Sequence, residues 1–161
     1  MLNRRTIFKI ILSLSIILIS KYLPANDQIT FLTLDGEQKK PEGPFVINFW
    51  ATWCAPCLKE LPDLEILAKE LRPEIPVFLV NIGETNEVVT KFYNEKSSLF
   101  GPYALVLLDT KMESMSKFKL RGLPTTVLFD SNGNEIRKIQ GIRPWASEKM
   151  ITLIKKEING I

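Results

Sequence analysis

Residues 45–57 have the sequence FVINFWATWCAPC, and much of the architecture of the chain can be inferred from this segment. Residues 45–51 form a continuous apolar run, which is typical of a central strand covered on both faces. Cys54 and Cys57 follow directly, and from Cys54 onward leucines recur at helical spacing as far as Leu71. The segment therefore predicts a buried strand that leads into a helix, with both cysteines at the helix start.

Strand-like and helix-like segments alternate along the rest of the chain. The predicted strands are residues 27–35, 77–82, 103–108, 125–129 and 135–140, and the predicted helices are residues 54–71, 86–96, 111–119 and a last one after Pro144. Residues 36–44 are expected to be a polar connection, and Pro62 is expected to kink the first helix. This order predicts an α/β fold, a three-layer α/β/α sandwich with a mixed central sheet.

A hairpin and an amphipathic helix are expected to close the domain. Asn132-Gly133 separates the last two predicted strands, and Asn-Gly is the favoured pair for a type I′ turn. The last helix is predicted to carry one apolar stripe, formed by Trp145, Met150, Ile151, Ile154 and Ile158. This stripe is expected to pack on the sheet.

Residues 1–25 are expected to be a targeting segment that precedes a single folded domain over residues 26–161. Arg4, Arg5 and Lys9 form a positive start, and an apolar run follows. That pattern is typical of a secretory signal peptide, although residues 7–23 also suit a thin membrane span. An uncleaved membrane anchor and a cleaved signal both stay open. In either case the positive start predicts a periplasmic (extracytoplasmic) domain, held at the inner membrane if the segment is retained.

The charge of the chain argues against a nucleic-acid partner. The formal net charge is +3, but residues 1–25 hold four basic residues and no acidic one. The rest of the chain is therefore slightly acidic, whereas a nucleic-acid-binding domain carries its basic excess on the folded part.

The chain contains only two cysteines and no histidine. Two cysteines three positions apart close too small a loop to constrain the unfolded chain, so a purely structural disulfide is a poor explanation. A zinc site would lack two of its usual four ligands. We therefore expect redox chemistry, with no metal and no cofactor.

The predicted position of the cysteines suits nucleophilic chemistry. Unpaired backbone N–H groups and the positive end of the helix dipole stabilise a thiolate at a helix N-terminus, and such cysteines have lowered pKa values. Pro56 fits the first helical turn, where its missing N–H is no loss. Cys54 is expected to attack the disulfide of a partner, and Cys57 to resolve the resulting mixed disulfide.

The residues around the dithiol resemble the thioredoxin superfamily. The likeness rests on Trp53-Cys54-Ala55-Pro56-Cys57, and the wider segment 48–57 with Glu60, Pro62 and residues 122–126 is similar to the membrane-anchored reductases typified by ResA and TlpA. It covers about residues 28–158 and implies a thioredoxin-like fold. Proteins of that group serve cytochrome c and copper-oxidase maturation.

Glu60 is the predicted partner of the buried thiol. Ordinary thioredoxins carry an aspartate six residues before the first cysteine, where this chain has Asn48. The resemblance implies a functional glutamate at Glu60, and a buried carboxylate with a raised pKa suits proton transfer. The alternative is that Glu60 is a solvated surface residue.

Trp53, Leu123 and Pro124 are the predicted substrate-binding residues. The resemblance implies that Pro124 is cis and faces the dithiol, which would leave the Leu123 backbone free to pair with an extended substrate. An ordinary trans proline is the alternative. Trp53 is expected to flank Cys54 at the docking surface, with a core position as the alternative, and Trp50 is expected to be a core residue.

These observations predict an enzyme, an extracytoplasmic thiol–disulfide oxidoreductase that reduces protein disulfides in cytochrome c maturation. The resemblance implies a membrane thiol reductase of CcdA or DsbD type as electron donor, and apocytochrome c as a substrate. Two alternatives stay open. The protein could reduce the copper-site cysteines of cytochrome oxidase, or it could be a general disulfide oxidase or isomerase.

Three other classes fit the sequence poorly. Thioredoxin-fold copper carriers use C-x-x-x-C with a distant histidine, and this chain has neither. Peroxiredoxins place Thr or Ser three residues before the reactive cysteine, where this chain has Ala51. A non-enzymatic adaptor would have no use for an intact dithiol.

Overall fold

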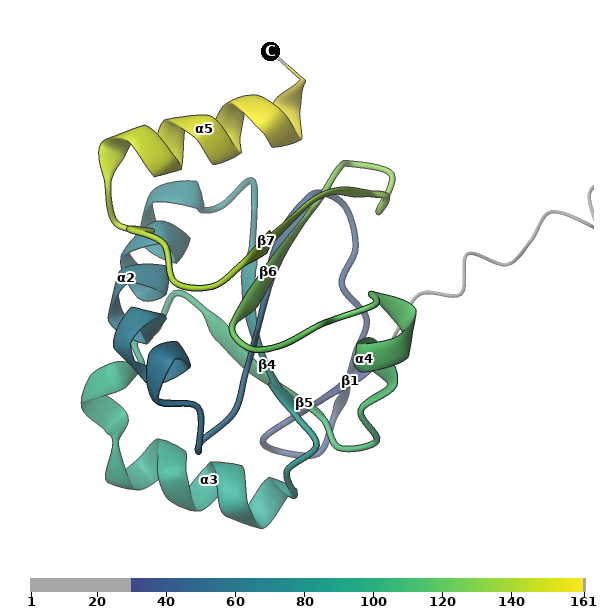
Figure 1. Ribbon diagram of the computed structural model, residues 1–161, viewed down its shortest axis with the longest axis vertical. Helices are drawn as coiled ribbons and strands as arrows, with labels where there is room; N and C mark the ends of the chain where they lie inside the picture. The colour runs from purple at the N-terminus through teal and green to yellow at the C-terminus, as the bar shows by residue number, and fades with distance from the viewer. Residues whose placement is uncertain (1–29, 161) are drawn as a thin grey trace, which may run out of the picture.

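A seven-stranded mixed sheet forms the middle layer of the protein in the computed structural model, which describes residues 30–160 (Figure 1). The strand order is β2-β1-β5-β4-β3-β6-β7. Strands β3, β4 and β5 run parallel, and the other neighbours pair antiparallel. The strands are β1 (Phe31–Thr33), β2 (Gln38–Lys39), β3 (Phe45–Trp50), β4 (Val77–Ile82), β5 (Leu105–Asp109), β6 (Thr125–Phe129) and β7 (Glu135–Gln140).

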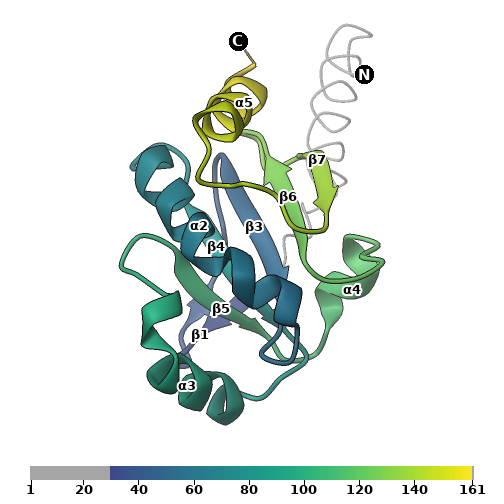
Figure 2. The ribbon, with the colours of Figure 1, turned by 60° about the vertical axis from the view of Figure 1, so that its left-hand side comes forward.

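Helices cover both faces of this sheet, so the predicted three-layer α/β/α sandwich is confirmed. One face carries α2 (Ala55–Leu71), α3 (Asn86–Glu95) and α5 (Glu148–Asn159), and the other carries the short α4 (Glu113–Lys117) (Figure 2). A 3-10 turn, η1 (Ser97–Leu99), follows α3. Each face has its own apolar core, because strand side chains alternate between the two faces.

The alternation along β3 determines which of its side chains meet α2. Val46 and Trp50 belong to the core beneath α2, whereas Ile47 and Phe49 belong to the core on the side of α4. Asn48 lies between Ile47 and Phe49 and therefore points toward α2. This places a polar side chain in the largely apolar layer under the helix that carries the cysteines.

The N-terminal part of the domain differs from the prediction. The predicted strand 27–35 is the short β1, and its residues 27–29 lie outside the described part of the chain. The polar segment 36–44 is not only a connection, because β2 within it pairs with β1. Exposed charged and amide side chains gave no alternating pattern from which this edge strand could be recognised.

The hairpin is confirmed, but its predicted turn type is wrong. A type I′ turn needs positive φ at both central residues, and here Gly133 has a φ of 75° while Asn132 is not among the residues with positive φ. The Asp130 carboxylate accepts the backbone N–H groups of Asn132 and Asn134 instead. Local hydrogen bonding by Asp130 therefore selects a longer loop, followed by a bulge in β7.

The closing helix begins later than the apolar stripe suggested. Ser147 caps α5 by accepting the N–H of Met150, so Trp145 lies before the helix. Met150, Ile151, Ile154 and Ile158 pack on the core as predicted. Trp145 is also buried, but it reaches the core from the loop that follows β7.

Two further features concern prolines and the N-terminal segment. Helix α2 runs without interruption through Pro62, and the peptide bond from Arg72 to Pro73 is cis, which the sequence did not indicate.

The predicted targeting segment 1–25 lies outside the described residues. Within residues 30–160, no helix combines the length and the apolar character needed to cross a membrane.

Candidate functional site

Cys54 and Cys57 lie where strand β3 passes into helix α2. Cys54 is the N-cap of α2, and its Sγ accepts the backbone N–H of Cys57 at 3.3 Å. The two cysteines are joined by a disulfide bond, and their Cα atoms are 5.3 Å apart. Pro56 occupies the first turn, as expected. The sulfur of Cys54 is therefore placed to receive backbone N–H dipoles at the start of the helix.

The two sulfurs differ in how easily a partner can reach them. Cys54 is 5% exposed and Cys57 is fully buried. Trp53, next to Cys54, is 71% exposed, so the core position considered for this residue is wrong. Trp50 is fully buried, as predicted, and packs near Phe92 and Phe100. The exposed side of the site therefore includes Trp53, Ala55 and Pro56, which surround the small exposed part of Cys54.

Sheet register brings Leu123 and Pro124 to the same edge as the dithiol. Strand β6 runs antiparallel to β3, and Thr125 pairs with Phe49 near the end of β3. Pro124 therefore lies level with the last residue of β3, just before the chain turns toward Cys54. The peptide bond from Leu123 to Pro124 is cis, as the resemblance implied. Leu123 is half-buried and packs on both apolar cores.

Glu60 is buried beneath α2, so the alternative of a solvated surface residue is wrong. It is 1% exposed, and its two carboxylate oxygens have different partners. Asn48 Nδ2 donates to Oε1 at 2.8 Å, and Trp145 Nε1 donates to Oε2 at 2.7 Å. Burial raises the pKa of Glu60 above its ordinary value, because it penalises the charged form. Hydrogen bonds from Trp145, Asn48 and the Arg143 backbone, with the charge of Arg143, oppose that rise in pKa.

A second carboxylate holds the segment that precedes the cysteines. Glu84, after the end of β4, accepts the backbone N–H of Thr52 at 2.7 Å, the Thr52 hydroxyl at 2.5 Å and Asn81 Nδ2 at 2.7 Å. Sequence reasoning missed Glu84. The position of Glu84, two residues after β4, could have indicated its role. Strand β4 is parallel to β3, and the carboxyl ends of parallel strands lie at the same edge of the sheet.

Trp145 is the other site residue that sequence reasoning missed. Its hydrogen bond to Glu60 joins residues 85 positions apart, and no local pattern indicates it. Among residues 30–160, no group of three or more His, Cys, Asp or Glu side chains is arranged to hold a metal ion.

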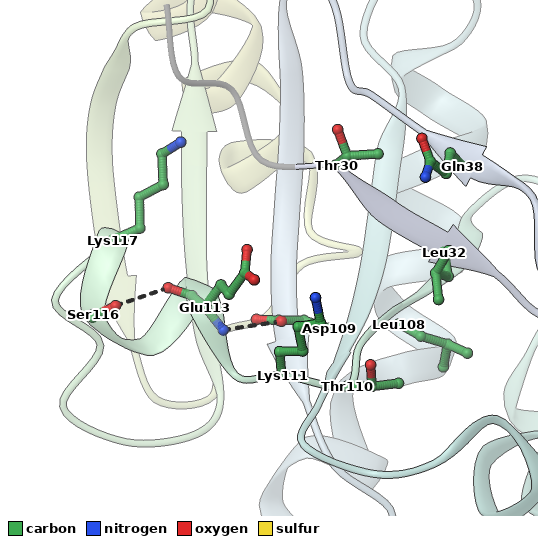
Figure 3. A pocket seen from close by; sticks show the side chains of 10 residues that line it. All are labelled: Thr30, Leu32, Gln38, Leu108, Asp109, Thr110, Lys111, Glu113, Ser116 and Lys117. Atoms are coloured by element: carbon green, nitrogen blue, oxygen red, sulfur yellow. Dashed lines mark hydrogen bonds between the residues drawn. The ribbon is translucent and has the colours of Figure 1, made fainter.

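A separate hollow lies between β1, β5 and α4 (Figure 3). Thr30, Leu32, Asp109, Lys111 and Lys117 are among the residues that line it. The Asp109 carboxylate accepts the backbone N–H groups of Glu113 and Ser114, so its oxygens cap α4. The hollow is lined by none of the dithiol residues.

The fold and the dithiol at the start of α2 define a class, the thioredoxin-fold proteins with an active-site cysteine pair. The chain belongs to the Redoxin family, whose sequence profile matches residues 26–153, and within it to the ResA-like thiol–disulfide oxidoreductases.

Individual relatives agree with this assignment. The chain is 32% identical over 103 residues to the thiol–disulfide oxidoreductase ResA of Bacillus subtilis, a match that covers 63% of this chain and 55% of that protein. It is 31% identical to ResA of Halalkalibacterium halodurans, over 77% of this chain and 72% of the relative. The crystal structure of StoA from Bacillus subtilis superposes with a TM-score of 0.63 at 25% identity, covering 77% of this chain and 95% of StoA. The chain thus spans little more than half the length of the first of these relatives.

Proposed function

We propose that this protein is an extracytoplasmic thiol–disulfide oxidoreductase that reduces disulfides in other proteins through Cys54 and Cys57. The observation that carries the proposal is the position of Cys54, at the N-cap of α2 with its sulfur accepting the Cys57 N–H. A sulfur in that position is stabilised as a thiolate, which is the form that attacks disulfides.

In the first step, the thiolate of reduced Cys54 attacks one sulfur of a substrate disulfide. A bond forms between Cys54 Sγ and that sulfur, and the substrate disulfide bond breaks. The other substrate sulfur leaves as a thiolate and takes up a proton. Trp53 and the Leu123 backbone lie at the edge of the sheet where the substrate has to approach, and we assign them to docking.

In the second step, Cys57 loses its proton and attacks Cys54 Sγ. The bond between Cys54 and the substrate breaks, the second substrate sulfur leaves reduced, and the Cys54–Cys57 disulfide forms. Two electrons have then passed from this protein to its substrate. We assign Glu60 as the acceptor of the Cys57 proton, because the two residues are three positions apart on one face of α2, where Cβ atoms lie about 5–6 Å from each other, and because both side chains are buried.

Each reaction cycle leaves Cys54 and Cys57 oxidised, so an electron donor has to reduce them before the next cycle. Outside the cytoplasm disulfides form readily, so electrons have to be resupplied across the membrane. We propose a membrane thiol reductase of CcdA or DsbD type as that donor, and the cysteines of apocytochrome c as the substrate. Similarity to proteins of the ResA type supports this assignment, and the charged and apolar pattern of residues 1–25 supports export.

The reduction potential tests the direction of electron flow. We expect a value closer to that of thioredoxin, about −270 mV, than to that of DsbA, about −120 mV. The measurement is equilibration of the dithiol with glutathione or dithiothreitol couples, with the thiols counted after acid quenching. A value near that of DsbA would instead identify an oxidase.

Trapping tests the substrate. Cys57→Ser keeps the attacking sulfur and removes the resolving one, so mixed disulfides should accumulate on Cys54. With oxidised apocytochrome c offered to the reduced variant, we expect a covalent complex that dithiothreitol releases. Capture of copper-site cysteines of an oxidase subunit in preference to apocytochrome c would identify the copper branch of this chemistry instead.

A further inference from the structure

Trp145 touches the carboxylate to which we assign the Cys57 proton, although it belongs to a distant part of the chain. It lies in the segment between β7 and α5 and is fully buried. Its indole N–H donates to Glu60 Oε2 at 2.7 Å, while Asn48 holds Oε1. The carboxylate therefore accepts one hydrogen bond from the sheet and one from the segment that leads into α5.

The two donors differ in what they can do when Glu60 takes up a proton. An indole N–H only donates, so it can bond an oxygen with a free lone pair but cannot accept from a carboxylic O–H. A side-chain amide both donates and accepts. In the present arrangement Asn48 Nδ2 donates to Glu60 Oε1 and to Thr126 Oγ1, while Asn48 Oδ1 is buried without a hydrogen-bond partner. A turn of the amide would present this oxygen to Glu60 and Thr126 as an acceptor.

These properties give the two carboxylate oxygens different tasks. We propose that Trp145 is a positioning residue for Glu60, whose indole N–H reserves Oε2 so that an incoming proton resides on Oε1, where Asn48 can accept the resulting O–H. This inference rests on the proposed role of Glu60 in resolving the mixed disulfide. The proton lost by Cys57 then lies between Glu60 and Asn48. The negative charge passes from the Glu60 carboxylate to the Cys57 sulfur, so the net charge of the site is unchanged.

The other groups around Glu60 are mostly neutral. Asn48 from β3 and Thr126 from β6 carry no charge, and α5 contributes the apolar Ile154 to the core beneath α2. On its own helix, the titratable neighbour is Cys57. Arg143, two residues before Trp145, is the charged group that acts on Glu60, and it opposes the rise in the Glu60 pKa that burial causes. The test therefore changes the indole and leaves Arg143 in place.

The first test is the pH profile of the resolving step in Trp145→Phe, which keeps the ring and removes the N–H. Mixed disulfides between Cys54 and a substrate peptide are formed in a rapid-mixing experiment, and peptide release is followed from pH 5 to 9. Because a hydrogen bond to a charged group is lost, we expect the rise of the rate with pH to move upward by about 1 to 2 pH units. Trp50→Phe is the matched control, since Trp50 is equally buried but its Nε1 has no partner. Its profile should coincide with that of the unaltered protein.

Glu60→Gln distinguishes a wrong role for Glu60 from a wrong role for Trp145. If this variant keeps the unaltered pH profile, the assigned role of Glu60 is wrong. If it abolishes the rise but Trp145→Phe leaves the rise in place, Glu60 acts without Trp145 and the positioning role is wrong. In the double variant, Trp145→Phe should leave the pH profile of Glu60→Gln unchanged.

A second measurement needs no change at Trp145. The chain has three tryptophans, so three indole N–H signals are expected in the nuclear magnetic resonance spectrum. The Trp145 signal should shift at the pH where Glu60 titrates and should keep the chemical shift of a hydrogen-bonded N–H on both sides of that pH. The shift should vanish in Glu60→Gln. A Trp145 signal that takes the value of a free indole at low pH would show that the proton goes to Oε2, and would overturn the proposal even if Trp145→Phe did not fold.

Discussion

Replacing Asn48 by aspartate should make the stability of the domain strongly dependent on pH. Asn48→Asp puts a carboxylate oxygen where Nδ2 now lies, 2.8 Å from Glu60 Oε1. Two unit charges at that separation repel by about 6 kcal/mol at an effective dielectric constant near 20. Two carboxylates this close cannot both ionise, so the pair is expected to share one proton at neutral pH.

The size and sign of the effect follow from proton linkage. The unfolded chain releases these protons near the ordinary carboxyl pKa values, about 3.9 for aspartate and 4.3 for glutamate. The native variant holds one proton more than the unfolded chain above that range, so its free energy of unfolding falls as the pH rises. The slope is about 1.4 kcal/mol per pH unit, which amounts to about 4 kcal/mol between pH 5 and pH 8.

The assay is urea unfolding of the oxidised protein at intervals from pH 5 to pH 8. The double variant Asn48→Asp with Glu60→Gln is the control, because it keeps the new carboxylate and removes its like-charged neighbour. Its stability should vary with pH much less than that of the single variant. Equal pH dependence in the single variant and the unaltered protein, or a slope that persists in the double variant, would refute the coupling between these two positions.

Three further outcomes follow from the site and its supports. Mixing each reduced variant with a disulfide peptide should give a stable covalent complex for Cys57→Ser and none for Cys54→Ser, and a complex with Cys54→Ser on gel electrophoresis would reverse the two assignments. Glu84→Leu should lower the free energy of urea unfolding by about 2 kcal/mol, because the N–H and hydroxyl of Thr52 lose a charged acceptor, whereas an unchanged midpoint would show that water replaces it. Ser147→Ala should cost about 1 kcal/mol through loss of the α5 cap, and thermal unfolding checks this against Ser147→Thr, which should retain most of the stability.

The parts of the fold that depend on local sequence could be predicted. The apolar run of β3, the leucine spacing of α2 and the two strands of the hairpin each carry their own periodic signal, and the structure has them where that signal lies. The edge strand β2 has two exposed residues and owes its conformation to pairing with β1, which no local pattern records. The predicted turn type was wrong for a related reason, since hydrogen bonds to the Asp130 carboxylate outweigh the preference of Asn-Gly for a type I′ turn.

The site divides in the same way. The two cysteines lie three positions apart in the sequence, and the segment with Leu123 and Pro124 stands out by its motif. The surroundings of Glu60 are assembled from β3, α2 and the segment before α5, so Trp145 could not be placed from its own neighbours. Its apolar character fitted a helix stripe equally well, and only the fold shows that its N–H faces a carboxylate.

The unequal burial of the two sulfurs also constrains the kinetics. Only Cys54 retains any contact with solvent, since Cys57 is fully covered. A donor and an acceptor would both have to meet the same atom, so they compete for one place on the surface and cannot occupy it together. Turnover then takes the ping-pong form, in which excess of either partner slows the reaction of the other. Because both partners react at the Cys54 sulfur, the protein needs no second binding site to keep the two half-reactions in order.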